Sequence, residues 1–244
     1  MIEGAIFDFD GTLFDSMYIW EEVGEDLLKS LNKKAKPGFR EKIKPMSLWQ
    51  SANYCKEEYD IKLSTEEIIV RINNIVSDYY INKVEPKPYV KDFLESLRKK
   101  DIKMCIATVA DKTLIESALG RCDMKKYFID VLDCKDIAEG KHTPSIYLKA
   151  IKCLGSTVCK TCVFEDAAYA INTAKSAGFI VVAVYDSFED KEAMIRRTAD
   201  IYLENYSDVD KFWKFILFSF LFSDIFKISH AIISKNTKET RKWS

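Results

Sequence analysis

Two aspartates, Asp8 and Asp10, follow an apolar run at residues 5–7 and are separated by a single residue. If residues 5–9 form a strand, successive side chains alternate between its two sides, so both carboxylates point the same way. Adjacent carboxylates repel each other unless a cation or a shared proton offsets the repulsion. Open α/β sheets bind ligands at the carboxyl ends of their strands, and Gly11 ends this predicted strand. We therefore expect cation-binding or acid–base chemistry here, with an ordinary acidic turn as the alternative.

The nine residues DFDGTLFDS, at positions 8–16, resemble the first motif of the haloacid dehalogenase superfamily, in particular that of its β-phosphoglucomutase-like phosphatases. The resemblance implies that Asp8 attacks phosphorus, and that Asp10 protonates the leaving group and later activates water. Uncatalysed phosphate-monoester hydrolysis needs an acceleration approaching ~10²¹, of which one general acid or base supplies roughly 10² to 10⁴. A covalent aspartyl-phosphate, a metal ion and fixed cations are expected to supply the rest.

Two further segments resemble the second and third motifs of this family. Thr108 closes the apolar run at residues 106–107, where the family has a serine or threonine that binds the transferring phosphoryl group. A threonine at a strand end is also common for its β-propensity. Thr108 is therefore assigned to the second motif because it lies between the first and third motifs in the sequence. The segment GKHTPSIY, residues 140–147, resembles Gly-Lys-Pro-x-Pro-Asp-x-Tyr, which implies that Lys141 binds phosphate and steadies the nucleophile. His142 departs from that pattern and is expected to be an exposed loop residue.

Glu165 and Asp166 follow a third apolar run and match the fourth motif, whose aspartate holds Mg²⁺ in the family. Capping the next helix is the alternative role for Asp166. Mg²⁺ prefers oxygen ligands, and it usually takes few protein carboxylates and keeps several waters. The resemblance implies a magnesium site formed by Asp8, the backbone carbonyl of Asp10 and Asp166, with Glu165 in a supporting role.

Length and composition indicate a globular protein. The chain has 244 residues, of which 48% are hydrophobic, enough for one large domain with an insert. Its formal net charge of −1 gives no overall bias toward nucleic acid. Residues 1–4 lead directly into the predicted nucleophile strand and leave no room for a cleavable signal segment, so a cytoplasmic location is expected.

The cysteines indicate neither disulfides nor a metal site. Seven cysteines are an odd number in a chain expected to be cytoplasmic, which predicts reduced thiols. Cys159 and Cys162 form a single CxxC pair that leads into a predicted strand. Because no second cysteine or histidine pair stands at ligand spacing, we expect neither a zinc site nor a redox site.

Helical periodicity dominates residues 15–86. Ser16 is a candidate N-cap for the first helix, and the segment at residues 64–67 is a capping box for the third. The prolines at residues 86 and 88 break the pattern. We predict an all-helical insert at residues 15–86, which the resemblance identifies as a cap. Its three apolar stripes are Trp20, Val23, Leu27 and Leu31; Leu48, Ala52, Cys55 and Tyr59; and Ile68, Ile72, Ile75 and Tyr79.

From residue 89 the sequence alternates between helical and strand patterns, which is typical of a parallel sheet. Residues 1–14 and 87–210 are therefore predicted to form a doubly wound, Rossmann-like α/β core. Helices are expected at residues 89–100, at 111–119 ended by Gly120, from Thr143 and Pro144 to Gly155, and from about 166 to Gly178. Strands are expected at residues 102–108, near 131–132, and at 161–165, 180–184 and 201–203.

The complete set of motifs predicts a Mg²⁺-dependent phosphatase that hydrolyses a small phosphorylated metabolite, such as a sugar phosphate, through an aspartyl-phosphate. Dehalogenases of this superfamily lack the second acid, so Asp10 disfavours dehalogenation. The β-phosphoglucomutases carry a cap histidine where this chain has Trp20, so a phosphosugar mutase is the alternative enzyme. A phosphonatase would need a Schiff-base lysine in the cap, and no cap lysine matches a motif. A non-catalytic binding protein with the same fold is the other alternative.

The resemblance ends near residue 208, before an aromatic segment at residues 212–226. Its charge-free stretch, residues 215–223, is shorter than the ~20 residues that span a bilayer. Residues 211–244 carry seven basic and two acidic residues, a net +5, which leaves −6 for the remaining chain. We predict that this extension packs as a helix against the core or against a second subunit in a homodimer. Binding to an anionic membrane surface is the alternative.

Overall fold

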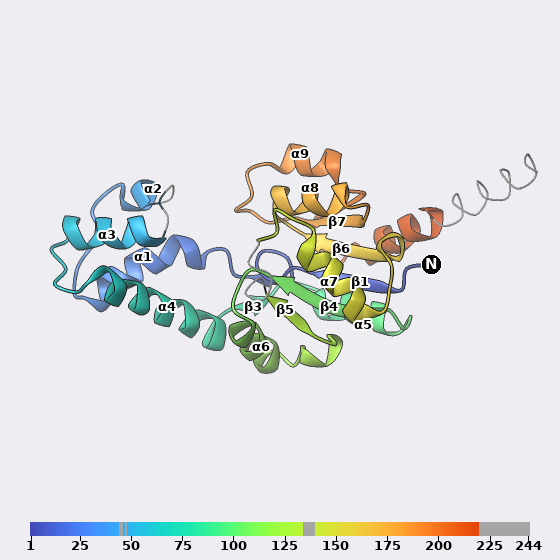
Figure 1. Cartoon of the computed structure of the whole chain (residues 1–244), viewed down its shortest axis with the longest axis horizontal. Coiled ribbons are helices and arrows are strands. Elements are labelled where there is room, and N and C mark those ends of the chain that lie inside the picture. The colour runs from blue at the N-terminus through green and yellow to red at the C-terminus, as the bar shows by residue number, and fades with distance from the viewer. Residues whose placement is uncertain (44–45, 47, 134–139, 220–244) are drawn as a thin grey trace, which may run out of the picture.

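The centre of the computed structural model, which describes residues 1–43, 46, 48–133 and 140–219, is a six-stranded parallel sheet (Figure 1). Its strands are β1 (Gly4–Phe7), β4 (Lys103–Thr108), β5 (Val131–Asp133), β6 (Thr161–Glu165), β7 (Ile180–Val184) and β8 (Ile201–Leu203). Their order is β5-β4-β1-β6-β7-β8, and each pair of neighbours is parallel. The chain builds outward from β1 in both directions, so the order reverses between β1 and β6. This is the doubly wound α/β fold predicted from the sequence.

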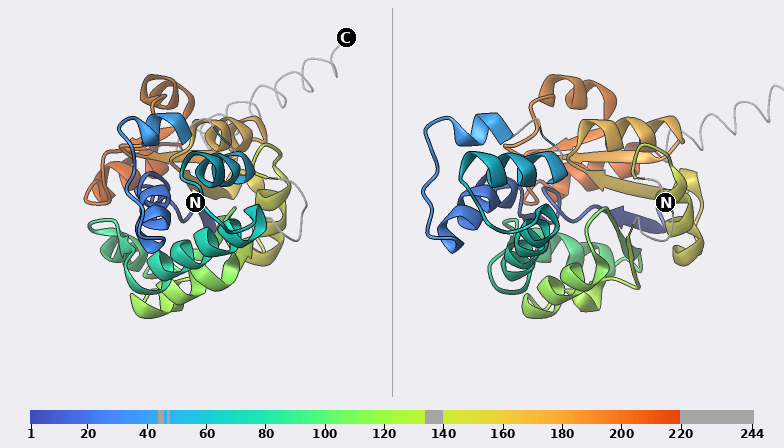
Figure 2. Two further views of the ribbon diagram at one scale, coloured as in Figure 1. Left: turned by 90° about the vertical axis from the view of Figure 1, so that its left-hand side faces the viewer. Right: turned by 60° about the vertical axis from the view of Figure 1, so that its left-hand side comes forward.

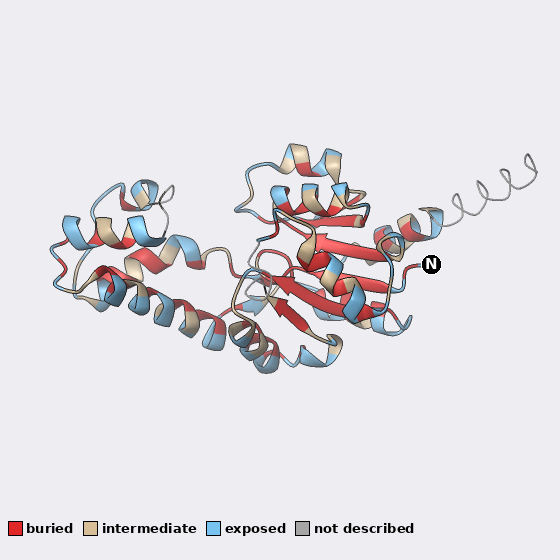
Figure 3. Cartoon of the chain, viewed as in Figure 1, coloured by how far each residue is buried: buried red, intermediate tan, exposed pale blue. Residues whose placement is uncertain are grey.

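Helices cover both faces of the sheet. They are α5 (Val90–Arg98), α6 (Lys112–Arg121), α7 (Ser145–Leu154), α8 (Ala168–Ser176), α9 (Glu192–Thr198), a C-terminal helix at residues 209–219, and the 3₁₀ helices η1 (Lys125–Tyr127) and η3 (Val158–Lys160). Because side chains alternate along β1, Phe7 packs in one buried cluster with α5, α6 and the C-terminal helix. Ile6 packs in the opposite cluster with α7, α8 and α9. Figure 3 shows the buried strands between helices whose outer faces are exposed.

Four further helices lie beyond one end of the sheet and form what we call the helical unit (Figures 1 and 2). They are α1 (Ile19–Ser30), α2 (Phe39–Ile43), α3 (Leu48–Glu58) and α4 (Thr65–Asn82). All four lie within the residues predicted to form the insert, and α2 is a helix that the sequence did not predict. The short antiparallel strands β2 (Phe14–Asp15) and β3 (Glu85–Pro86) connect this unit to the rest of the chain.

Helix starts in this unit were predicted with mixed success. The capping box of α4 is present, because Ser64 Oγ accepts a hydrogen bond from the Glu67 N–H at 3.2 Å and Glu67 Oε2 accepts one from the Ser64 N–H at 2.7 Å. The prediction that Ser16 caps the first helix is wrong. α1 begins at Ile19, and the Ser16 hydroxyl instead donates to the carboxylate of Asp10.

The predicted end of α6 at Gly120 is also wrong. The helix continues to Arg121, and Asp123 takes the left-handed conformation in the following turn, with a φ of 52°. Aspartate tolerates this conformation better than most side chains, so a glycine was not needed. In contrast, Gly155 ends α7 with a φ of 64°, as predicted. The prediction that Thr143 caps this helix and Pro144 begins it is wrong by one residue, because α7 begins at Ser145 and Pro144 takes the N-cap position.

The C-terminal helix packs on the sheet through the buried side chains of Phe212 and Ile216. The ring centroid of Phe212 lies 5.2 Å from that of Phe93 and 5.7 Å from that of Phe164. Much of the predicted apolar and basic extension, residues 220–244, lies outside the described residues. In the part of the chain that the structure describes, no helix is both long and apolar enough to cross a membrane. The cytoplasmic location and the homodimer stay predictions.

Candidate active site

The residues predicted for the site lie at the carboxyl ends of the strands, around β1 and β6, where the strand order reverses. Ligands of open α/β sheets bind at this position because the carboxyl ends of the strands diverge there. Thr108, Lys141 and Glu165 are buried, as are both Asp8 and Asp166, whereas Asp10 is half-buried. Asp8 and Asp10 follow β1, Thr108 ends β4, Lys141 precedes α7, and Glu165 and Asp166 stand at the end of β6.

The Lys141 ammonium lies between Asp8, the predicted nucleophile, and Glu165 of the fourth motif. Its Nζ donates to Asp8 Oδ1 and, at 2.7 Å, to Glu165 Oε1. Burial alone would lower the pKa of Lys141, but attraction to Asp8 and Glu165 outweighs burial and raises this pKa above its usual range. Lys141 is therefore a fixed cation beside Asp8.

Three buried carboxylates could hold a metal ion. One oxygen from each of Asp8, Glu165 and Asp166 lies within 4.8 Å of the others. Glu165 Oε1 accepts hydrogen bonds from Lys141 and, at 2.7 Å, from the Tyr147 hydroxyl, but its Oε2 is buried without a partner among the described residues. Burial, followed by repulsion from Asp8, raises the pKa of Asp166 well above its usual range. A cation that prefers oxygen ligands would give the unpartnered Glu165 oxygen a partner and would offset the repulsion between Asp8 and Asp166. These residues therefore fit the predicted magnesium site.

The turn after β1 is held against Asp166 by Gly11 and Thr12. Thr12 Oγ1 donates to Asp166 Oδ1 at 2.8 Å. Gly11 has a φ of +74°, and a Cβ atom at this position would lie 2.3 Å from Asp166 Oδ2. Glycine alone permits both this conformation and this close approach. The contact explains why a Gly-Thr pair follows the second aspartate of the motif, a role for Thr12 that the sequence did not reveal.

Asp10 faces α4 of the helical unit. Its Oδ1 accepts hydrogen bonds from Ser16 Oγ and from the Tyr80 hydroxyl, both at 2.6 Å. Burial, followed by repulsion from Asp8, raises the pKa of Asp10 to about 6. A carboxyl group with this pKa can hold a proton close to neutral pH and still release it, as a general acid must.

Tyr80 is the main site residue that the sequence analysis missed. It is separated from Asp10 by 70 positions, so no local motif connects the two. Tyr80 is 1% exposed and lies one helical turn after Val76 on the buried face of α4. The apolar stripe predicted for this helix runs through Ile72, Ile75 and Tyr79 and omits Tyr80, and such a stripe predicts packing and not a hydrogen bond to an acid.

Two predicted assignments concern Thr108 and His142. Thr108 is fully buried at the end of β4, and its Oγ1 accepts a hydrogen bond from the Ala110 N–H at 3.1 Å. Binding of a phosphoryl group by Thr108 stays a prediction, as does metal binding by the backbone carbonyl of Asp10. His142 is exposed, as expected, and its ring stacks on that of Tyr169 with 4.6 Å between centroids.

The site opens into a cavity of about 710 Å³ that lies between the helical unit and the sheet. Asp8, Asp10 and Lys141 line one side of this active-site cavity, and Asn73 and Tyr80 of α4 contribute to the other. A pocket of this size can enclose a small organic ligand. The arrangement can therefore place a substrate between a buried nucleophile with its cation and the helices opposite.

Residues 5–184 match the model of the haloacid dehalogenase-like hydrolase family. The chain belongs to this family. It is 28% identical over 199 residues to a phosphorylated carbohydrates phosphatase of Thermotoga maritima, an alignment that covers 81% of this chain and 92% of the relative. It is 24% identical over 181 residues to the fructose-1-phosphate phosphatase YqaB of Escherichia coli, covering 74% of this chain and 95% of that protein.

The fold comparison agrees with the sequence comparison. A crystal structure from Thermotoga maritima, provisionally assigned as a β-phosphoglucomutase, superposes with a TM-score of 0.77 and 26% identity. The match covers 87% of this chain and 99% of the other. The resemblance to the phosphoglucomutase-like branch of the superfamily and the predicted fold are thus confirmed, and the chain is a hydrolase of this family.

Proposed function

We propose that this protein is a Mg²⁺-dependent phosphatase that hydrolyses a small phosphorylated metabolite through a phosphoryl group carried on Asp8. The observation that carries the proposal is the position of Lys141 Nζ, which bridges Asp8 and Glu165 beside the buried carboxylate cluster. A cation fixed at the nucleophile offsets the repulsion between a carboxylate and an approaching phosphate dianion. The relatives named as phosphatases of phosphorylated carbohydrates and of fructose 1-phosphate support a phosphomonoester of similar size.

The proposed reaction has two displacement steps. In the first, an Asp8 oxygen forms a bond to phosphorus while the bond from phosphorus to the alcohol oxygen breaks, and that oxygen takes a proton from Asp10. In the second, Asp10, now a carboxylate, removes a proton from a water molecule whose oxygen attacks phosphorus. The bond between phosphorus and Asp8 then breaks and inorganic phosphate leaves. Both side chains are thereby returned to their starting protonation states.

Charge balance leaves one proton in the site, and the proposed reaction requires that proton on Asp10. Asp8, the Asp10 carbonyl and Asp166 would hold Mg²⁺, which would supply positive charge to the phosphoryl oxygens, while Thr108 and Lys141 would bind those oxygens directly. The four carboxyl groups of the site would then face three positive charges, two on the ion and one on the lysine, so one proton would remain. Asp10 is the carboxyl group that the mechanism requires in its protonated form.

We further propose that residues 15–86 form a cap over a core made of residues 1–14 and 87–210. The active-site cavity supports this division because both parts line it. Closure about the paired strands β2 and β3 would exclude water from the phosphoryl intermediate. Trp20 lines the cavity at the position where the mutases have a histidine, which favours a phosphatase over a phosphosugar mutase.

The test is Asp8→Asn, whose amide cannot act as the anionic nucleophile. Phosphate release from a panel of phosphomonoesters in the presence of Mg²⁺ should fall by more than about 10³-fold. Asp92→Asn is the matched control, because this aspartate is exposed on α5, does not line the active-site cavity and should leave turnover intact. Near-wild-type turnover by the Asp8 variant would refute the mechanism.

A further inference from the structure

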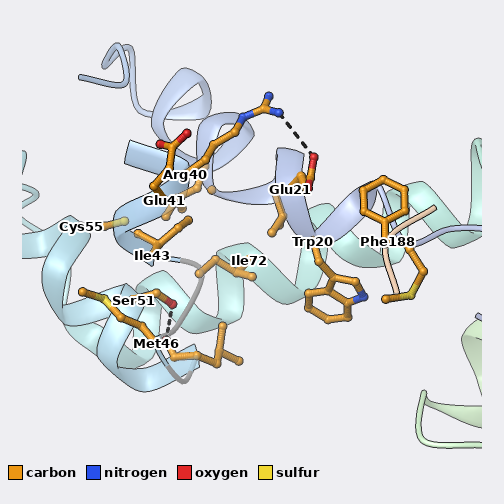
Figure 4. A pocket seen from close by; sticks show the side chains of 15 residues that line it. Trp20, Glu21, Arg40, Glu41, Ile43, Met46, Ser51, Cys55, Ile72 and Phe188 are labelled. Carbon is orange, nitrogen blue, oxygen red and sulfur yellow. Dashed lines mark hydrogen bonds and ion pairs between the residues drawn. The ribbon is translucent and has the colours of Figure 1, made fainter. Parts of the chain in front are cut away.

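A second cavity adjoins the active-site cavity and lies mostly within the helical unit, with Phe188 from the segment after β7 at one end (Figure 4). Its volume is about 620 Å³, within the range of pockets that hold small organic ligands. Met17 and Trp20 line both cavities, so the two meet at these side chains. We call this second cavity the apolar pocket. The side chains that form its wall and rim include Leu27, Ile43, Leu48, Cys55, Ile72 and Phe188.

Most of the side chains that line the apolar pocket present hydrocarbon or sulfur. Leu27, Cys55 and Ile72, which come from α1, α3 and α4, are 0%, 2% and 5% exposed. Their positions follow the apolar stripes of three different helices, yet the helices leave a cavity between them instead of closing on one another. A concave, mostly apolar surface of this kind favours an apolar ligand, because such a ligand loses contact with water on entry.

Four polar side chains line the pocket, Glu21, Arg40, Glu41 and Ser51, and the structure pairs Arg40 and Ser51 with neighbours. The Arg40 guanidinium pairs with Glu25 at 2.7 Å and with Glu21 at 3.9 Å, and Ser51 Oγ donates to the Leu48 carbonyl oxygen at 3.0 Å. A polyol buried here would lose the bonds of several hydroxyls to water, and the mostly apolar lining offers few groups to replace them. A second phosphate would also approach the carboxylate of Glu21. Polyols and bisphosphates therefore fit the apolar pocket poorly.

Two aromatic side chains are exposed near the junction of the cavities. Trp20 is 52% exposed and Phe188, from the segment after β7, is 37% exposed, and Figure 4 shows them at the same end of the apolar pocket. Trp20 was predicted to join the buried stripe of α1, but it lines both cavities instead. Exposed aromatic surface at a cavity is available to cover an apolar ligand.

We propose that the apolar pocket receives the organic part of the substrate, so that the preferred substrate is the phosphomonoester of an alcohol with an extended apolar chain or ring. This inference rests on the proposed function, since it assumes that the phosphate binds beside Lys141. The alcohol then occupies the active-site cavity, and a chain of several carbons continues past Met17 and Trp20 into the apolar pocket. The occupant is thus a hydrocarbon group attached to the same phosphate.

Hydrolysis of ethyl and hexyl phosphate by the full-length protein tests this inference. The two substrates have the same reacting bond and differ by four methylene groups. Burial of those groups should raise kcat/KM for hexyl phosphate on the order of 10²-fold above that for ethyl phosphate. Glycerol 3-phosphate, which has hydroxyl groups in place of the chain, should resemble ethyl phosphate. Equal values for the two alkyl phosphates, or a preference for glycerol 3-phosphate, would overturn the inference.

A pair of variants locates the effect. Leu48→Glu places a charge at the rim of the apolar pocket, where the leucine is 41% exposed, and should reduce the hexyl-to-ethyl ratio to within a few-fold of 1. Val70→Glu makes a comparable change on α4, where the valine is 58% exposed and lines neither cavity. This control should retain the wild-type ratio. The same loss in both variants would contradict an effect specific to the pocket.

Binding of non-hydrolysable alkylphosphonates separates this inference from the proposed function. Titration calorimetry should give a lower dissociation constant for hexylphosphonate than for ethylphosphonate, by a similar factor on the order of 10². Turnover with equal phosphonate affinities would refute the apolar pocket alone. Chain-length-dependent binding without turnover of any phosphomonoester would refute the phosphatase mechanism alone.

Discussion

The hydrogen bond from Tyr80 to Asp10 can be tested through the pH dependence of catalysis. The Tyr80 hydroxyl donates to Asp10 Oδ1 at 2.6 Å, which stabilises the carboxylate and lowers the pKa that burial raises. Tyr80→Phe removes this donor and should therefore raise the pKa of Asp10 above about 6. A hydrogen bond to a charged group contributes roughly 1.5–3 kcal/mol, and one pKa unit corresponds to about 1.4 kcal/mol. Because Ser16 still donates to the same oxygen, we expect the pKa of Asp10 to rise by about one unit, which corresponds to the lower end of this energy range.

The sign of the effect on the rate follows from the protonation state. Asp10 must be protonated in the first step, so kcat/KM should fall as pH rises through its pKa. In Tyr80→Phe this decline should move to higher pH by about one unit. Tyr79→Phe is the matched control, because the Tyr79 hydroxyl donates to Glu22 and Asp26, away from the site. Profiles of kcat/KM against pH, measured with one substrate, should separate the variants. An unchanged profile, or a shift to lower pH, would refute the role of Tyr80.

Two other substitutions test the site turn and the C-terminal helix. Gly11→Ala should abolish phosphate release without unfolding the protein, because its Cβ would lie 2.3 Å from Asp166 Oδ2 at a φ of +74°, and activity within a few-fold of wild type would contradict this contact. Phe212→Ala should lower the free energy of unfolding by about 3–5 kcal/mol in urea titrations, because the ring is fully buried. Leu217→Ala is its control at a side chain that is 54% exposed, and equal losses in the two variants would show that packing of Phe212 is not the cause.

The sequence predicted the sheet well because its signals are local. Apolar runs at β6, β7 and β8 gave the strand bounds correctly, and Gly155 marked the end of α7 through its left-handed conformation. The same rule failed at Gly120, because Asp123 supplied the left-handed residue two positions beyond the end of the helix. Several residue types can adopt the left-handed turn conformation, so the residue that ends a helix is hard to predict. A short run of buried β-branched and apolar residues, in contrast, fits few structures other than a strand.

The sequence predicted only those site residues that lie in a recognisable motif. Asp8 and Lys141 were found from separate segments, and their contact follows from the meeting of strand ends at one edge of the sheet. Ser16 was misassigned because a serine before a helix usually caps it, and nothing local shows that Asp10 lies closer. Tyr80 and the apolar pocket depend on how four helices pack, which a stripe pattern does not specify.

The helical unit contributes to the chemistry as well as to the enclosure of the site. Asp10 owes its raised pKa first to burial, and α4 supplies both part of that burial and the Tyr80 hydroxyl that opposes it. Ser16, which lies next to β2 at the start of the predicted insert, supplies the second donor to the same oxygen. The proton affinity of the proposed general acid therefore depends on how closely α4 approaches the turn after β1. A substrate whose hydrocarbon part held the helical unit in place would also fix the position of α4, and with it the pKa of Asp10. Binding of the preferred alcohol and protonation of its oxygen by Asp10 would then be coupled through α4.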